Sequence, residues 1–131
     1  MIILFSRMAR KESIMEITQM QLINLTPHTI TFFAGDKVTL SIKTHGVARV
    51  LSAPKIVRYI QVGDVSIPQT HTLYGEIEGL PDPVPGVGYI VSNMIVSALA
   101  QRGIHRDDLF TPGTQVRDDQ GRVIGCHTLD N

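Results

Sequence analysis

The chain has few of the residues that cross-link a fold or fill a large hydrophobic core. It contains one cysteine, no tryptophan, three tyrosines and four phenylalanines among 131 residues. A single cysteine excludes a disulfide framework within the chain. Eleven glycines and seven prolines are present instead, which predicts short elements joined by many turns.

An excess of charge of either sign is also lacking. Twelve basic side chains balance twelve acidic ones, and the formal net charge is zero. General binding to nucleic acid needs a basic surplus that releases counterions from phosphates, so this class is disfavoured. The balance equally disfavours a disordered acidic tail and a basic helix on a membrane surface.

Long hydrophobic runs are absent as well, and spanning a bilayer takes about 20 apolar residues. The apolar residues 1–5 precede the first basic residues, which is the reverse of the order in a secretory signal. We therefore expect a cytoplasmic protein without membrane contact.

Residues 1–19 are interpreted as a poorly ordered leader, because further methionines within and just after it offer alternative starts. A single β-rich domain is expected at 20–131, a length typical of one domain. The alternative is a genuine N-terminal helix with a small apolar stripe formed by Ile14, Met15 and Ile17.

Short apolar runs between turn residues predict strands from Gln21 onward. The clearest is Lys37 to Ile42, where apolar and polar residues alternate as in a half-buried strand. Gly35-Asp36 and Gly63-Asp64 predict hairpin turns. Further strands are expected at 21–25, 30–33, 47–51, 56–62, 65–68, 73–78, 89–91, 115–117 and 122–129, with a turn at 118–121.

One helix is predicted, at about 93–102. Ser92 suits its N-cap, and Gly103 suits the left-handed position after its last turn. The helix is apolar nearly all round and lies in Gly79 to Gln101, a segment whose one charge is Asp82. Such a helix is expected to be buried in the fold or at a subunit contact. We therefore expect a β-rich α+β fold, a mostly antiparallel sheet or small barrel with one buried helix, in a homo-oligomer.

Cys126-His127 is the first candidate for catalysis, because an imidazole can activate a thiol. Neighbours on a regular strand point to opposite faces, so a buried structural thiol is the favoured interpretation. Asp107 and Asp108 could serve acid–base chemistry or magnesium binding. Ion pairing with nearby arginines is the favoured alternative there, as it is in the similar cluster at 117–122.

No metal or cofactor is expected, because the five histidines show none of the spacings typical of metal ligands. A strand leading into the helix at Ser92 could instead present free amides to an anion. The alternative is that Ser92 only caps the helix and binds no ligand. The candidate ligand-binding residues are Ser92, Asn93, His28, Arg106 and Asp108.

Several short motifs follow one another in a specific order over about Met20 to Leu129. With them the chain resembles a family of small uncharacterised proteins encoded by bacteriophages and prophages, apart from its leader. The resemblance implies a bacterial cell during phage carriage or infection, and no activity. The motifs are Asn24-Leu25-Thr26-Pro27-His28, Gly79-Leu80-Pro81 with Pro83 and Pro85-Gly86, Tyr89-Ile90-Val91-Ser92, Arg106, Asp108, Pro112-Gly113, Val116-Arg117-Asp118 and Gly121 to Cys126.

Three function classes follow. The first is a non-enzymatic binding protein that takes a host protein or a small anionic ligand such as a nucleotide near Ser92. The second is a small hydrolase or transferase that uses Asp107, Asp108 and a histidine. The third is a phage structural or assembly protein.

Overall fold

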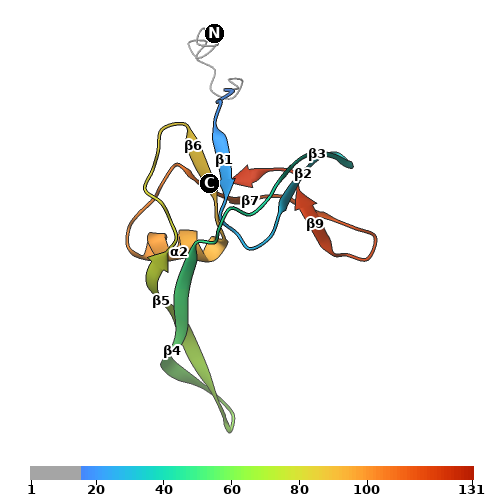
Figure 1. Ribbon diagram of the computed structural model, residues 1–131. Helices are drawn as coiled ribbons and strands as arrows, with labels where there is room; N and C mark the ends of the chain where they lie inside the picture. Colours follow the sequence, from blue (N-terminus) through green and yellow to red (C-terminus); the bar gives the residue numbers. More distant parts are fainter. Residues whose placement is uncertain (1–15) are drawn as a thin grey trace, which may run out of the picture.

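The computed structural model describes residues 16–131, which form a β-rich structure with one short helix (Figure 1). The strands of this part of the chain form three open sheets, two of four strands and one of two. The elements are β1 (Gln21–Asn24), β2 (Ile30–Ala34), β3 (Lys37–Ile42), β4 (Arg49–Val62), β5 (Val65–Glu78), β6 (Val87–Ile90), α2 (Asn93–Gln101), β7 (Leu109–Pro112), β8 (Gln115–Arg117), β9 (Val123–Cys126) and β10 (Leu129–Asp130).

The central sheet has the strand order β1–β6–β7–β10, and β1, β6 and β7 run parallel. Asn24 is paired with Ile90, and Tyr89 is paired with Leu109. Helix α2 connects β6 to β7, and this crossover lets the two strands run in the same direction. Only β10 is antiparallel to its neighbour, β7.

The second four-stranded sheet has the order β3–β2–β9–β8. β2 is antiparallel to β3 and parallel to β9, to which it is joined through Phe32 and Cys126. Both predicted turns of this sheet are confirmed. Gly35 has a φ of 65° between β2 and β3, and the Gly121 amide donates to the Asp118 carbonyl at 3.0 Å.

The third sheet is a hairpin of two 14-residue strands, β4 and β5, which projects away from the other elements (Figure 1). Gly63, with a φ of 59°, begins its predicted turn. Four strands are predicted over this segment, but the structure has two. Strand β4 runs through Pro54, and β5 continues past Pro68, the last residue of a predicted strand. A two-stranded sheet has two open edges, so a proline can remain in it without removing a ladder hydrogen bond.

The core lies where α2 covers the central sheet. Ile90, Val91, Ile95 and Ala98 are completely buried, and Leu25, Tyr89, Leu99 and Leu109 nearly so. The helix ends as predicted, with Gly103 at a φ of 73° after the C-cap Arg102. Burial of the helix is one-sided, however, because Met94 is 43% exposed.

Two features of the predicted fold class need correction. The sheets of residues 16–131 are open and no barrel is detected, and both four-stranded sheets mix parallel with antiparallel strands. The α2 crossover explains the parallel pairing of β6 with β7. Most of the predicted leader lies outside the described residues, and residues 16–20 are exposed and belong to no strand or helix. In the described part, no helix is both long and apolar enough to cross a membrane.

Candidate functional site

The motif that begins at Asn24 forms a hydrogen-bonded corner between β1 and β2. The Asn24 side chain is fully buried, and its Nδ2 donates to the carbonyls of His28 at 2.8 Å and Ile42 at 2.9 Å. Its Oδ1 accepts from the amide of Thr26 at 2.9 Å and from the Thr26 hydroxyl at 2.7 Å. All four hydrogen-bonding positions of this amide are therefore used inside the protein. This part of the motif has a structural role.

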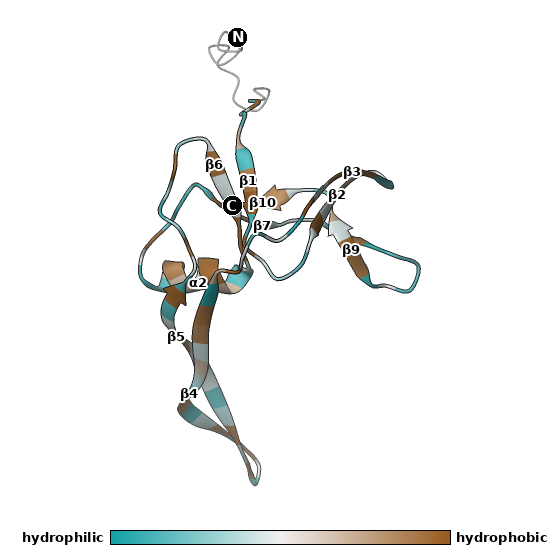
Figure 2. Ribbon diagram, in the orientation of Figure 1, coloured by the Kyte–Doolittle hydropathy of each residue, from teal (hydrophilic) through white to brown (hydrophobic). Residues whose placement is uncertain are grey.

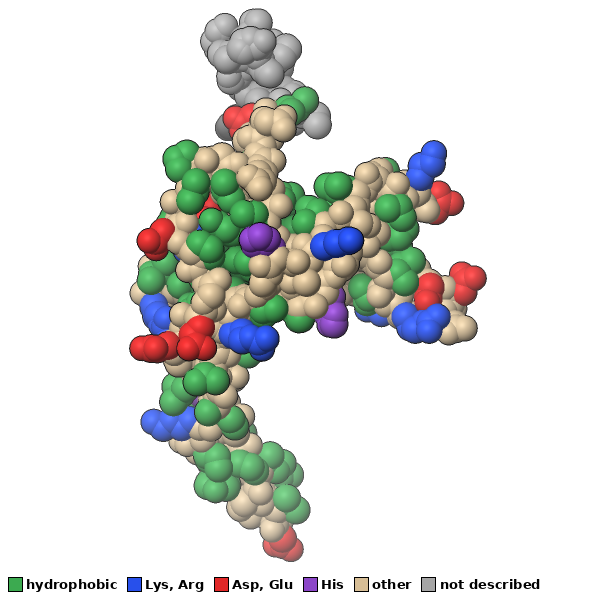
Figure 3. All heavy atoms as spheres, viewed as in Figure 1, with side chains coloured by type: hydrophobic (Ala, Val, Ile, Leu, Met, Phe, Trp, Pro, Cys, Tyr) green, Lys and Arg blue, Asp and Glu red, His purple; other side chains and the backbone are tan. Residues whose placement is uncertain are grey.

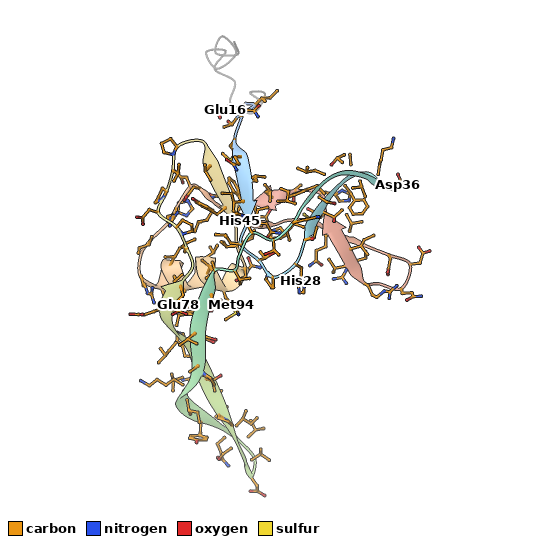
Figure 4. The ribbon with its side chains drawn as sticks, viewed as in Figure 1. Glu16, His28, Asp36, His45, Glu78 and Met94 are labelled. Atoms are coloured by element: carbon orange, nitrogen blue, oxygen red, sulfur yellow. The ribbon has the colours of Figure 1, made fainter. Side chains whose placement is uncertain are left out.

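The His28 side chain is exposed beside that corner (Figure 4). It lines a groove of about 360 Å³ together with residues of β2, β8 and β9, among them Ile30 and Ile124. The lining is mainly apolar, so His28 is one polar group at the edge of an apolar surface. We find no other residue of the predicted ligand-binding set among the residues that line this groove.

Arg106 and Asp108 bind each other. The Arg106 Nε donates to one carboxylate oxygen of Asp108 at 2.9 Å, and Nη2 donates to the other at 2.6 Å. Both side chains are only 16% exposed. This hydrogen bonding lowers the pKa of Asp108 and raises that of Arg106. The pair is therefore charged at neutral pH, and both carboxylate oxygens of Asp108 accept from Arg106 within the fold.

The other predicted charge clusters are also paired internally. His105 Nε2 lies 3.1 Å from an exposed carboxylate oxygen of Asp107. In the β8–β9 turn, Asp118 accepts from the Arg122 amide and from its Nε, each at 2.9 Å, and hydrogen bonding to the Arg122 amide contributes most to lowering the pKa of Asp118. The predicted pairing with arginine is confirmed for Asp108, which binds Arg106, and for Asp118, which binds Arg122, but Asp107 lies beside His105 and not beside an arginine.

Ser92 and Asn93 stand at the start of α2. Ser92 has the extended backbone of an N-cap residue, with φ −76° and ψ 160°, but its hydroxyl makes no capping hydrogen bond. Asn93 is exposed. Neither residue lines the groove at His28 or the smaller cavity at Arg106. The five predicted ligand-binding residues thus lie at three separate places in the described part of the chain.

Cys126 is buried, as predicted for a structural thiol. Its burial raises the pKa of the thiol, which disfavours the reactive thiolate. The neighbouring His127 uses Nδ1 in a 3.0 Å contact with the carbonyl oxygen of Phe33. Within residues 16–131 no group of three His, Cys, Asp or Glu side chains is placed to hold a metal ion.

Among residues 16–131, the β4–β5 hairpin carries more exposed large apolar residues than any other element pair, a feature that our sequence reasoning missed. Figure 2 shows hydrophobic residues along its strands, and Figure 3 shows their side chains on its surface with an acidic side chain at the tip. Nine large apolar residues of this hairpin are between 43% and 77% exposed. They are Leu51, Ile56, Val57, Tyr59, Ile60, Val62, Val65, Ile67 and Leu73.

The register divides the outer half of the hairpin into two unlike faces. Val62 is paired with Val65 and Ile60 with Ile67, and these alternate pairs share one face. We call these four residues the aliphatic face. The opposite face carries the pairs Gln61–Ser66 and Tyr59–Pro68, and is therefore more polar and more aromatic. The signal for an aliphatic face was present in the sequence as alternation on both sides of Gly63-Asp64.

The base of the hairpin is fixed to the core. Val50 and Ile77 pack against the core residues, and the C-terminal end of α2 donates hydrogen bonds to β5. The Gln101 side chain donates to the carbonyl of Thr72 at 3.0 Å, and the Arg102 guanidinium donates to the carbonyl of Gly75. Figure 4 labels Glu78, the last residue of β5, at the base of the hairpin.

A hairpin fixed at its base and apolar towards its tip is suited to contact with another protein surface. The residues predicted for catalysis are paired or buried, whereas the aliphatic face is exposed. No protein-family model matches the chain, and no curated protein or solved structure is significantly similar to it.

Proposed function

We propose that the protein is a non-enzymatic binding protein, encoded by a phage or prophage, that acts as a homo-oligomer in the cytoplasm of the host bacterium. The exposed aliphatic face of the β4–β5 hairpin is the observation that carries this proposal. Contiguous exposed apolar surface commonly marks a site of contact with another protein. An isolated two-stranded hairpin is also only marginally stable in water, so contact with a neighbouring chain would stabilise it.

The internal pairing of the polar candidates supports a non-enzymatic role. The Asp108 carboxylate is held by Arg106, which leaves it poorly placed to exchange protons near neutral pH. The Cys126 thiol is buried. A hydrolase or transferase would need at least one activated group beside a substrate-sized cleft.

A structural or assembly protein of the phage is the second candidate. The observation that favours it is a second exposed apolar surface, on the β3–β2–β9–β8 sheet. Two separate apolar surfaces would let each copy contact two neighbours, as repeating assemblies require. The exposed apolar residues of this sheet are Val38 and Leu40 on β3 and Val123 and Ile124 on β9, each about half exposed.

The oligomeric state tests the proposal directly. Light scattering and sedimentation of the full chain should give a mass above that of the 14.5 kDa monomer as concentration rises. A chain that stays monomeric at high concentration would contradict the proposal. Mass spectrometry of purified virions separates the two candidates, because a structural protein is retained in the particle and a cytoplasmic binding protein is not.

A thermal-shift screen addresses the proposed small anionic ligand. Nucleotides and cyclic nucleotides that bind near Ser92 should raise the unfolding temperature, since a ligand that binds only the folded state stabilises it. Ser92→Ala would be expected to leave the shift in place, and a bulky Ser92→Tyr to remove it. No shift with any of these compounds would rule out this version of the ligand.

A further inference from the structure

We propose that two copies of the chain dock through the aliphatic faces of their hairpins, with the two hairpins antiparallel around a two-fold axis. This inference rests on the proposed homo-oligomer and names the surface that forms it. The occupant of each aliphatic face is therefore the same four residues of a second copy: Ile60, Val62, Val65 and Ile67.

The composition of the face suits contact with an identical copy. From Tyr59 to Thr70 the hairpin has one charged residue, Asp64, which lies in the turn. Two such faces can approach without bringing like charges together and without burying an unpaired charge. Two-stranded sheets packed face to face lie about 10 Å apart, which branched aliphatic side chains from both sides can fill.

The exposed area is sufficient for a weak specific dimer. The four side chains are 43–59% exposed and together offer roughly 300–400 Å² per copy. With the flanking residues, both copies would bury about 1,000 Å², the lower limit for a specific protein interface. Interfaces of this size are typical of weak association, so sedimentation over a range of concentrations is the suitable measurement.

Charge complementarity selects the antiparallel arrangement. Arg58 lies on the aliphatic face two residues before Ile60, and Asp64 lies in the turn two residues after Val62. At about 3.3 Å per residue, antiparallel overlap brings Asp64 of each copy close to Arg58 of the other. Parallel overlap would instead bring Asp64 of one copy close to the same carboxylate of the other, which is unfavourable.

Both charged groups are available for this contact. The ion pairs found among residues 16–131 include neither Arg58 nor Asp64. Arg58 Nε donates to Oε1 of Gln69 at 2.5 Å, which orients the guanidinium and leaves its terminal nitrogens free to donate to a carboxylate. An intermolecular pair at the rim would fix the direction of overlap more than it would add affinity.

The first test separates the two faces of the hairpin. The double variant Ile60→Thr with Ile67→Thr keeps β-branched side chains but removes apolar area from the aliphatic face. We expect its dimer dissociation constant, measured by sedimentation, to rise at least tenfold. Tyr59→Thr is the matched control on the opposite face and should change the constant less than threefold. Circular dichroism of each variant verifies that the fold is retained.

The second test separates the two directions of overlap. Arg58→Glu and Asp64→Arg should each weaken dimerisation several-fold at low salt, and the double variant should restore it. Lys37→Glu, in the distant β2–β3 hairpin, is the charge control and should have no effect.

The outcomes of these tests separate the inference from the proposed function. A monomeric wild-type chain contradicts the proposed function. An oligomer that tolerates the double threonine variant contradicts only docking through the aliphatic face. Sensitivity to that variant without restoration by the double charge reversal contradicts the antiparallel arrangement.

Discussion

The central sheet and the β4–β5 hairpin contain similar apolar residues, which are buried in the sheet and exposed in the hairpin. Ile95 and Ile90 are completely buried, whereas Ile60 is 43% exposed. The difference lies in what faces each side chain. Strand β6 has a strand on either side, and α2 adds Ile95 and Leu99 to the same core, while the outer halves of β4 and β5 have only each other. Apolar residues therefore become a core only where the chain itself supplies a second layer.

The two regions also differ in how their positions are fixed. The central region is joined by hydrogen bonds between distant segments, such as that from Asn24 to Ile42. The hairpin is fixed mainly at its base, where Gln101 and Arg102 of the helix end bind carbonyls of β5. Its outer half should therefore open more readily than the core in the monomer.

The largest effect on stability is expected from a substitution in the core. Ile95→Ala removes a completely buried side chain between α2 and the central sheet, and should lower the free energy of unfolding by about 2–5 kcal/mol. Denaturant unfolding at a concentration below dimer formation measures the change. A loss under about 1 kcal/mol would show that this core can collapse around the cavity.

The second largest effect on stability is expected at Asn24, in the corner between β1 of the central sheet and β2 of the second four-stranded sheet. Asn24→Ala removes four hydrogen bonds, two that its amide donates to partly buried carbonyls and two that its oxygen accepts from Thr26, so a loss of about 2–4 kcal/mol is expected. Asn24→Asp should be of similar severity, because the carboxylate cannot donate to the carbonyls of His28 and Ile42. Thr39→Ala, in an exposed part of β3, is the control and should cost little.

The sequence predicted local structure better than it predicted which elements would meet. The alternation in Lys37 to Ile42 and the glycines at Gly63 and Gly103 act over a few residues, and the structure confirms the strand and the turns. The half-buried face predicted for this strand is wrong, because Val38 and Leu40 are 54% and 51% exposed. The role of Asn24 could not be derived in this way, because its partner carbonyl at Ile42 is 18 positions away. In the sequence this asparagine is indistinguishable from an ordinary turn residue.

The sequence did not predict the direction of the strands or the exposure of their side chains. Strand β7 was missed, because Leu109 and Phe110 follow two aspartates and the strand ends in a proline at Pro112. Without β7, the parallel crossover from β6 could not be inferred. The aliphatic face was predicted as strand but not as surface, since alternation locates a face without saying what covers it. The candidate binding residues were chosen by type, and the structure shows Arg106 and Asp108 bound to each other.

A smaller effect on stability is expected from the ion pair between Arg106 and Asp108. The pKa of Asp108 is lowered by hydrogen bonding to Arg106, so the pair stabilises the fold above the unfolded carboxyl pKa of about 3.9. This contribution is lost as pH falls below that value and through the lower pKa of the folded state. Asp108→Asn should cost about 1.5–3 kcal/mol at pH 7 and flatten the acid-unfolding profile. Asp107→Asn, at an exposed neighbour, is the control.

The smallest effect should come from the same side-chain change in the hairpin. Ile60→Ala removes the atoms that Ile95→Ala removes, but from a side chain that water already reaches. In the dilute monomer the cost should be about 0.5 kcal/mol, mostly from lower strand propensity. At concentrations where the chain self-associates, the cost should grow, because the lost area then belongs to an interface. A monomer that loses as much stability from Ile60→Ala as from Ile95→Ala would mean that another part of the same chain covers the aliphatic face.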